Sequence, residues 1–127
     1  MLLILDTHAV LWWTLDSHRL GKQAARALAE AERVGIPAIA LWEVSVLVRK
    51  RKVHLDLPLA EWAERVLAIP RVEALPLDAA VALRADGLEM HGDPADRFIV
   101  AIALEHRARL ATKDALLRKL TFLETVW

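Results

Sequence analysis

The chain has 127 residues, which is enough for one domain with a substantial core and too few for two. Its 17 basic and 17 acidic side chains cancel, which excludes the overall positive field of proteins that coat nucleic acid, so any such contact must be local. Cysteine is absent and no apolar run reaches the roughly 20 residues that span a bilayer, so we expect a single cytoplasmic domain over residues 1–127, without disulfides, thiolate metal sites or membrane contact.

The first predicted element is a buried strand at residues 2–5, a continuous apolar run that ends at Asp6. This start also lacks the basic region and cleavage site of a signal peptide. Thr7 is expected to cap the helix that follows. The expected helices cover residues 9–15, 22–33, 41–52, 58–67, 78–88, 94–107 and 115–120, and the expected strands cover 2–5, 34–39, 72–75, 109–111 and, at a sheet edge, 122–126.

The predicted helix over residues 41–52 carries one charge in an apolar surrounding. Glu43 is the only charged residue between Ile36 and Val48, and an isolated carboxylate among core residues requires a partner or a bound cation. A buried hydrogen bond or salt bridge remains the alternative to a site role. The basic run Arg49-Lys-Arg-Lys at the end of this helix can be a solvated helix end, a local patch facing phosphate, or both.

Residues 91–103 begin with acids and continue into an apolar helical face. Asp93 before Pro94 is typical of a helix N-cap followed by proline at the first helical position. Asp96 falls in the first turn, and helical spacing places it on the inward face. Both acids can be helix caps only. Asp78 before the preceding helix is predicted to be a simple cap.

A further acid, Asp114, follows the predicted strand over residues 109–111. Alternating strands and helices predict an α/β/α sandwich with a mainly parallel sheet, and ligands of such sheets bind at the carboxyl ends of the strands. Acids converging there without cysteine favour Mg²⁺ or Mn²⁺, and hence phosphodiester hydrolysis. The spacing therefore groups four candidate catalytic and metal-binding residues, which are Asp6, Glu43, Asp96 and Asp114.

Four segments carry a resemblance to a known family. Residues 2–13 (LLILDTHAVLWW), 41–43 (LWE), 92–101 (GDPADRFIVA) and 110–114 (LATKD) resemble the successive motifs of PIN domains, above all the VapC-type toxins of toxin–antitoxin pairs. The resemblance covers nearly the whole chain in the right order. It implies a PIN-like fold and a prokaryotic, cytoplasmic endoribonuclease that depends on Mg²⁺ or Mn²⁺.

The resemblance also assigns site residues and partners. By position, Asp6, Glu43, Asp96 and Asp114 match the acids of the family, and Thr7 and Thr112 match hydroxyl positions near its site. Asp93 is an extra acid that either caps the helix or also touches metal. The resemblance further implies an RNA substrate, a homodimer and a tight complex with a small antitoxin.

The remaining candidates are given structural roles. We expect Arg97 to brace Asp96 or Glu43, with contact to phosphate as the alternative, and we assign neither His8 nor His91 to metal. Tryptophans could stack RNA bases, but Trp12, Trp13, Trp42 and Trp62 lie in apolar segments and are expected in the core or a dimer face, with Trp127 alone exposed.

Two functions from other classes compete with the nuclease. A phosphoacceptor signalling domain also places acids after strands and uses a lysine such as Lys113, but here Asp6 stands alone and Glu43 lies on a helix. A PIN-like scaffold that binds a partner without catalysis would use the acids to receive arginines. Retention of all four acids favours the enzyme.

Overall fold

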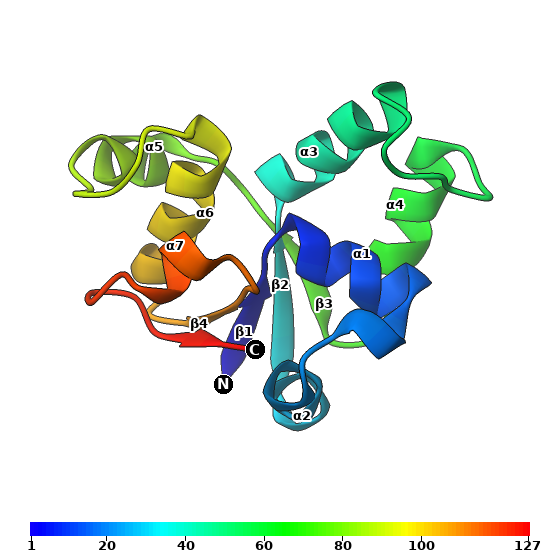
Figure 1. Ribbon diagram of the computed structural model, residues 1–127, viewed down its shortest axis with the longest axis horizontal. Coiled ribbons are helices and arrows are strands. Elements are labelled where there is room, and N and C mark those ends of the chain that lie inside the picture. Colours follow the sequence, from blue (N-terminus) through cyan, green and yellow to red (C-terminus); the bar gives the residue numbers. More distant parts are fainter.

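The computed structural model describes all residues from Met1 to Trp127 as an α/β/α sandwich (Figure 1). The central sheet has five parallel strands in the order β3-β2-β1-β4-β5. The strands are β1 (Leu2–Leu5), β2 (Arg33–Pro37), β3 (Val72–Leu75), β4 (Arg109–Ala111) and β5 (Thr125–Val126). This confirms the predicted fold class, with a sheet that is wholly parallel.

Seven α-helices and one short 3₁₀ helix, Ser17–Arg19, connect the strands. The α-helices are α1 (Thr7–Leu15), α2 (Lys22–Glu30), α3 (Ala38–Arg49), α4 (Leu59–Leu67), α5 (Ala79–Asp86), α6 (Pro94–Glu105) and α7 (Ala115–Arg118). None of them has the length and apolarity that a bilayer crossing requires.

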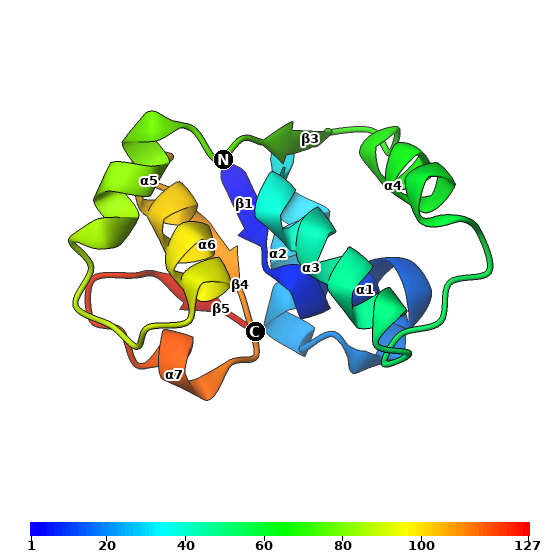
Figure 2. The same cartoon turned by 90° about the horizontal axis from the view of Figure 1, so that it is seen from above.

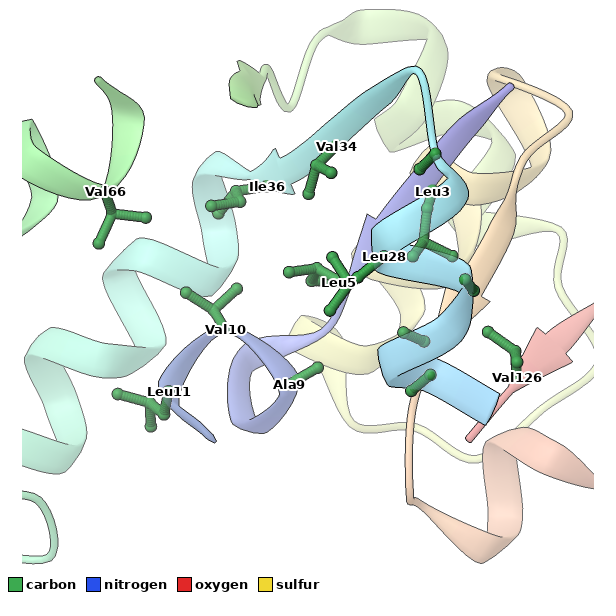
Figure 3. Packing of buried hydrophobic residues seen from close by; sticks show 14 of the residues in the cluster. Leu3, Leu5, Ala9, Val10, Leu11, Leu28, Val34, Ile36, Val66 and Val126 are labelled. Carbon is green, nitrogen blue, oxygen red and sulfur yellow. The ribbon is translucent and has the colours of Figure 1, made fainter. Parts of the chain in front are cut away.

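The two faces of the sheet bury separate cores because side chains alternate along each strand. Leu3 and Leu5 of β1 join a core with α1, α2 and α4, whereas Leu2 and Ile4 join a core with α5, α6 and α7. Figure 3 shows the first core, in which Val34 and Ile36 of β2 lie beside Leu5. In Figure 1 the helices of the second core lie to the left of the sheet.

Several predicted boundaries are wrong. Helix α2 ends at Glu30 and Arg33 already begins β2, where it pairs with Leu2 in the sheet. Helix α3 begins at Ala38 and ends at Arg49, so most of the basic run lies in the following turn, in which Arg51 has a positive φ of 57°. Strand β5 is shorter than predicted, although it does occupy the sheet edge.

Helix α3 is the element that closes the carboxyl edge of the sheet. It starts directly after β2 and packs on both α1 and α6. Figure 2, which looks onto this edge, shows α3 between α6 and α1. Side chains from both helical layers therefore meet above the ends of β1 and β4.

Candidate active site

A cavity of about 640 Å³ opens at this edge, and all five predicted acids line it. Three of them are helix N-caps: Asp6 caps α1, Asp93 caps α6 and Asp114 caps α7. Asp96 lies in the first turn of α6, and Glu43 lies on α3. The acids that the sequence grouped therefore do lie together, at the predicted edge of the sheet. The positive ends of three helix dipoles partly offset the mutual repulsion of these carboxylates.

Asp6 is held at both carboxylate oxygens. Its Oδ1 accepts the backbone N–H of Ala9 at 2.9 Å, and its Oδ2 accepts the hydroxyl of Thr112 at 2.5 Å. Thr112 is fully buried and also accepts the N–H of Asp114 at 3.1 Å, so it ties two acids together. Burial raises the pKa of Asp6, and the charge of Asp114 adds to that effect.

Thr7 does not cap α1, contrary to the sequence prediction. Asp6 takes that position, and the buried Thr7 hydroxyl donates instead to Glu43 Oε1 at 2.5 Å. Glu43 therefore has the polar partner that its apolar surroundings require, but this partner is neutral. Burial raises the pKa of Glu43, and the charges of Asp93 and Asp6 raise it further.

Asp96 is the acid on which three other carboxylates act. Burial, together with the charges of Asp93, Asp114 and Glu43, raises its pKa to about 6. Its Oδ2 lies 3.5 Å from His91 Nε2, and no hydroxyl donates to it. Asp93 caps α6 as predicted, with Oδ1 accepting the N–H groups of Ala95 and Asp96.

Arg97 does not brace Asp96 or Glu43, which corrects that prediction. Its guanidinium donates to backbone carbonyls of the segment that precedes α6. The acceptors are Ala85, Asp86, Leu88, Met90 and His91, at 2.7 to 3.3 Å. Arg97 therefore fixes the loop that ends at Asp93. A local pattern could not show this role because the acceptors are main-chain atoms.

Several residues that line the cavity were not predicted there. Trp42 is 56% exposed, which rules out the core, whereas the alternative of a dimer face stays a prediction. Trp62 is buried as expected, whereas Trp127 is half-buried because its ring packs edge-on against Trp12. The other lining side chains that were not assigned to the site are His8, Trp12, Val46, Leu47, Lys50, Lys52, Ile99 and Lys113.

The donor set of the cavity suits a hard cation. Its acidic groups supply only oxygen, and burial together with neighbouring carboxylates raises the pKa values of Glu43 and Asp96, an effect that a bound cation would oppose. No three Asp, Glu or His side chains converge as closely as a complete protein ligand set would. One or two carboxylates with water and phosphate oxygens are the usual ligands of Mg²⁺.

The sheet is parallel, has the strand order 3-2-1-4-5 and carries an acidic cavity at its carboxyl edge, and these features agree with one protein family. A family model described as "PIN domain" matches residues 3–123, and the chain belongs to this family. Ribonuclease VapC22 of Mycobacterium tuberculosis is 33% identical over 115 residues, which are 91% of this chain and 88% of the relative.

Solved structures agree on the fold. VapBC2 of Rickettsia felis, crystallised with a promoter DNA fragment, matches with a TM-score of 0.71 at 18% identity over 98% of this chain and 97% of the other. VapBC of Salmonella typhimurium, also bound to DNA, matches with a TM-score of 0.70 at 19% identity over 98% of this chain and 97% of the other. VapC20 of M. tuberculosis, a toxin that cleaves the sarcin–ricin loop, matches with a TM-score of 0.62 at 19% identity over 89% of this chain and 90% of the other.

Proposed function

We propose that this chain is an endoribonuclease that requires Mg²⁺ or Mn²⁺ and hydrolyses RNA phosphodiester bonds. The observation that carries the proposal is the convergence of Asp6, Glu43, Asp96 and Asp114 on one cavity, where three of them have raised pKa values. Membership of the PIN family and the similarity to Ribonuclease VapC22 support RNA as the substrate.

One or two of the four acids would hold the ion directly and the others would hold its water ligands, with Asp93 as an additional ligand candidate. When bound, the cation would neutralise phosphate charge and lower the pKa of attacking water. The two buried hydroxyls have a positioning role, because Thr112 and Thr7 fix Asp6 and Glu43 before substrate arrives. Lys113 lies on the same cavity and attracts the RNA backbone.

We further propose that the protein is the toxin of a toxin–antitoxin pair, forms a homodimer and is bound by a small antitoxin. The structures that share its fold include the VapBC complexes of R. felis and S. typhimurium. Copurification with the product of an adjacent short reading frame, followed by measurement of the mass of the complex, tests both partners.

The test of the enzymatic proposal is cleavage of total cellular RNA by the purified chain with Mg²⁺, with Mn²⁺ and with a chelator. We expect cleavage with either ion, none with the chelator, and a loss of at least about 100-fold in Asp6→Asn and in Asp96→Asn. Asp78→Asn is the matched control, since Asp78 caps α5 away from the cavity. Full activity of Asp6→Asn would contradict the proposal.

A further inference from the structure

The acidic cavity continues along α3 beyond the carboxylates. The lining residues of this helix and the turn after it are Trp42, Glu43, Val46, Leu47, Lys50 and Lys52. The Cα atoms of Glu43 and Lys50 are about 10 Å apart along the helix axis, from a rise of 1.5 Å per residue. The groove therefore has an acidic end at which Trp42 also lies, an aliphatic middle formed by Val46 and Leu47, and a basic end.

Trp42 is the unexplained residue of this groove. Its side chain is one of the most exposed large apolar groups of the chain, yet it stands beside Glu43. Trp12, which lines the same cavity, is already engaged: its ring contacts His8 and Trp127, and the guanidinium of Arg19 lies 4.7 Å from the ring centre. Trp42 has no aromatic or cationic neighbour at such distances. Its ring is free to stack on a ligand.

The basic run after α3 divides into two pairs. Lys50 and Lys52 line the cavity, whereas Arg49 and Arg51 do not. No carboxylate forms a salt bridge with either lysine, and Arg49 donates to Ser45 at 3.3 Å on the outer side of the helix. Two ammonium groups without salt bridges at the end of the cavity remote from Glu43 fit an anion that the carboxylates do not hold.

We infer that the α3 groove binds the nucleotide next to the cleaved bond, with an unpaired base stacked on Trp42 and its phosphate held by Lys50 and Lys52. This inference rests on the proposed ribonuclease function and adds to it a requirement for a single-stranded nucleotide at this position. Stacking on an aromatic ring accepts any base, so the groove positions the strand and leaves sequence preference to other contacts.

The first experiment measures kcat and KM for cleavage of single-stranded RNA of randomised sequence by the full chain. Trp42→Ala is expected to raise KM about 10-fold with little change in kcat, and Trp42→Phe is expected to retain most of the binding. Because Trp42 is exposed, neither change removes core packing. An unchanged KM in Trp42→Ala, with wild-type cleavage intact, overturns the inference and leaves the ribonuclease function standing.

The salt dependence of KM tests the lysines. The double variant Lys50→Gln, Lys52→Gln should flatten the slope of log KM against log salt by about 0.7 for each phosphate that the lysines no longer neutralise. The double variant Arg49→Gln, Arg51→Gln removes the same two charges from the same run outside the cavity and should leave the slope unchanged. Equal slopes for the double lysine variant and the wild type contradict a phosphate subsite.

An abasic ribose–phosphate strand, used as a competitor, separates base stacking from phosphate binding. Trp42→Ala should leave its inhibition constant unchanged, because no base is present to stack, whereas the double lysine variant should weaken it. If Trp42→Ala instead shifts the mass measured by sedimentation and leaves KM intact, a second copy of the chain covers the ring and the base subsite is wrong. If the wild type cleaves no RNA with either ion, the ribonuclease proposal fails and this inference fails with it.

Discussion

The cavity has two walls that hold their acids in different ways. On the wall formed by β1, α1 and α3, a buried threonine hydroxyl donates to each carboxylate: Thr112 to Asp6 and Thr7 to Glu43. On the wall formed by the start of α6, Asp93 caps the helix and Asp96 has only His91 nearby, at 3.5 Å. Both walls carry carboxylates with raised pKa values, but neutral hydroxyl donors fix only those of the first wall.

This difference bears on the proposed cation site. Hydroxyl donors stabilise the ionised form of Asp6 and Glu43 and hold their orientation, so these groups cost less when no ion is present. Asp96, with a pKa of about 6, is held in place against its own electrostatics. The segment before it must be anchored by other means, and Arg97 supplies the anchor through five backbone carbonyls.

The largest expected effect on stability comes from removing that anchor. Arg97→Met leaves the carbonyls of residues 85–91 without their charged donor and should lower the free energy of unfolding by about 3 kcal/mol in chemical denaturation. Arg97→Lys should retain only part of the lost unfolding free energy, because an ammonium group cannot reproduce the several hydrogen bonds of a guanidinium. Arg84→Met is the control, since its exposed salt bridge to Glu105 should be worth less than about 1 kcal/mol. Similar losses for both arginines would remove the special role of Arg97.

Replacement of Asp96 should stabilise the protein, in contrast to replacement of Arg97. In the absence of divalent cations, Asp96→Asn should raise the free energy of unfolding at neutral pH by about 2 kcal/mol, because it removes a charge that the fold disfavours.

The pH dependence follows from the same pKa. Folding raises the pKa of Asp96 from its ordinary value of 3.8 to about 6, so the folded state binds the proton more tightly. The unfolding free energy of the wild type should therefore fall as pH rises from about 4 to 6 and then level off, and this part of the pH dependence should be absent in Asp96→Asn. A destabilised Asp96→Asn would show that the second wall is not strained.

On the first wall, Thr112→Val should destabilise the protein by about 1.5 kcal/mol, because it leaves Asp6 Oδ2 and the Asp114 N–H without a partner. Thr112→Ser keeps the hydroxyl and should lose less stability than Thr112→Val. Thermal unfolding of both variants measures the difference. If valine and serine were equivalent, the hydroxyl would not be the element that fixes Asp6.

The smallest effect concerns Asp93. Asparagine is also a good N-cap, so Asp93→Asn should change stability by no more than about 0.5 kcal/mol. Since Asp93 is the charge that contributes most to the raised pKa of Asp96, this variant should lower that pKa toward its ordinary value. Titration of the Asp96 carboxyl by NMR measures the shift, and Asp86→Asn serves as the control. An unchanged pKa would show that Asp93 does not contribute and would assign the shift to burial and to the charges of Asp114 and Glu43.

The sequence predicted the sheet well because its strands are short apolar runs that end at polar residues. Strands β1, β3 and β4 have their predicted bounds, and the caps at Asp78 and Asp93 are confirmed. The end of α2 was wrong because Ala31 and Glu32 favour helix locally, whereas the backbone N–H of Glu32 bonds to Met1 and the chain turns into β2. Tertiary pairing overrides propensity at that point.

The acids of the site could be predicted because their residue type carries the chemistry. Residues whose role depends on the position of a helix could not be predicted. Acids at strand and helix ends indicated the cavity, since parallel strands end at one edge. The exposure of Trp42 could not be read from its apolar neighbours, because it depends on where α3 crosses the sheet edge. The helical spacing of Trp42, Val46 and Lys50 was the signal that places them on one side of α3.

The proposed function requires a divalent cation to bind beside Asp96, on the second wall. Thermal unfolding of the wild type and Asp96→Asn, each with a chelator and with Mn²⁺, tests it most directly. With chelator, Asp96→Asn should unfold at a higher temperature than the wild type. With Mn²⁺ at about 100 times its dissociation constant, the unfolding free energy of the wild type should rise by about 2.7 kcal/mol. The difference between the two unfolding temperatures should then shrink or change sign. A wild-type unfolding temperature that Mn²⁺ does not raise would contradict the account.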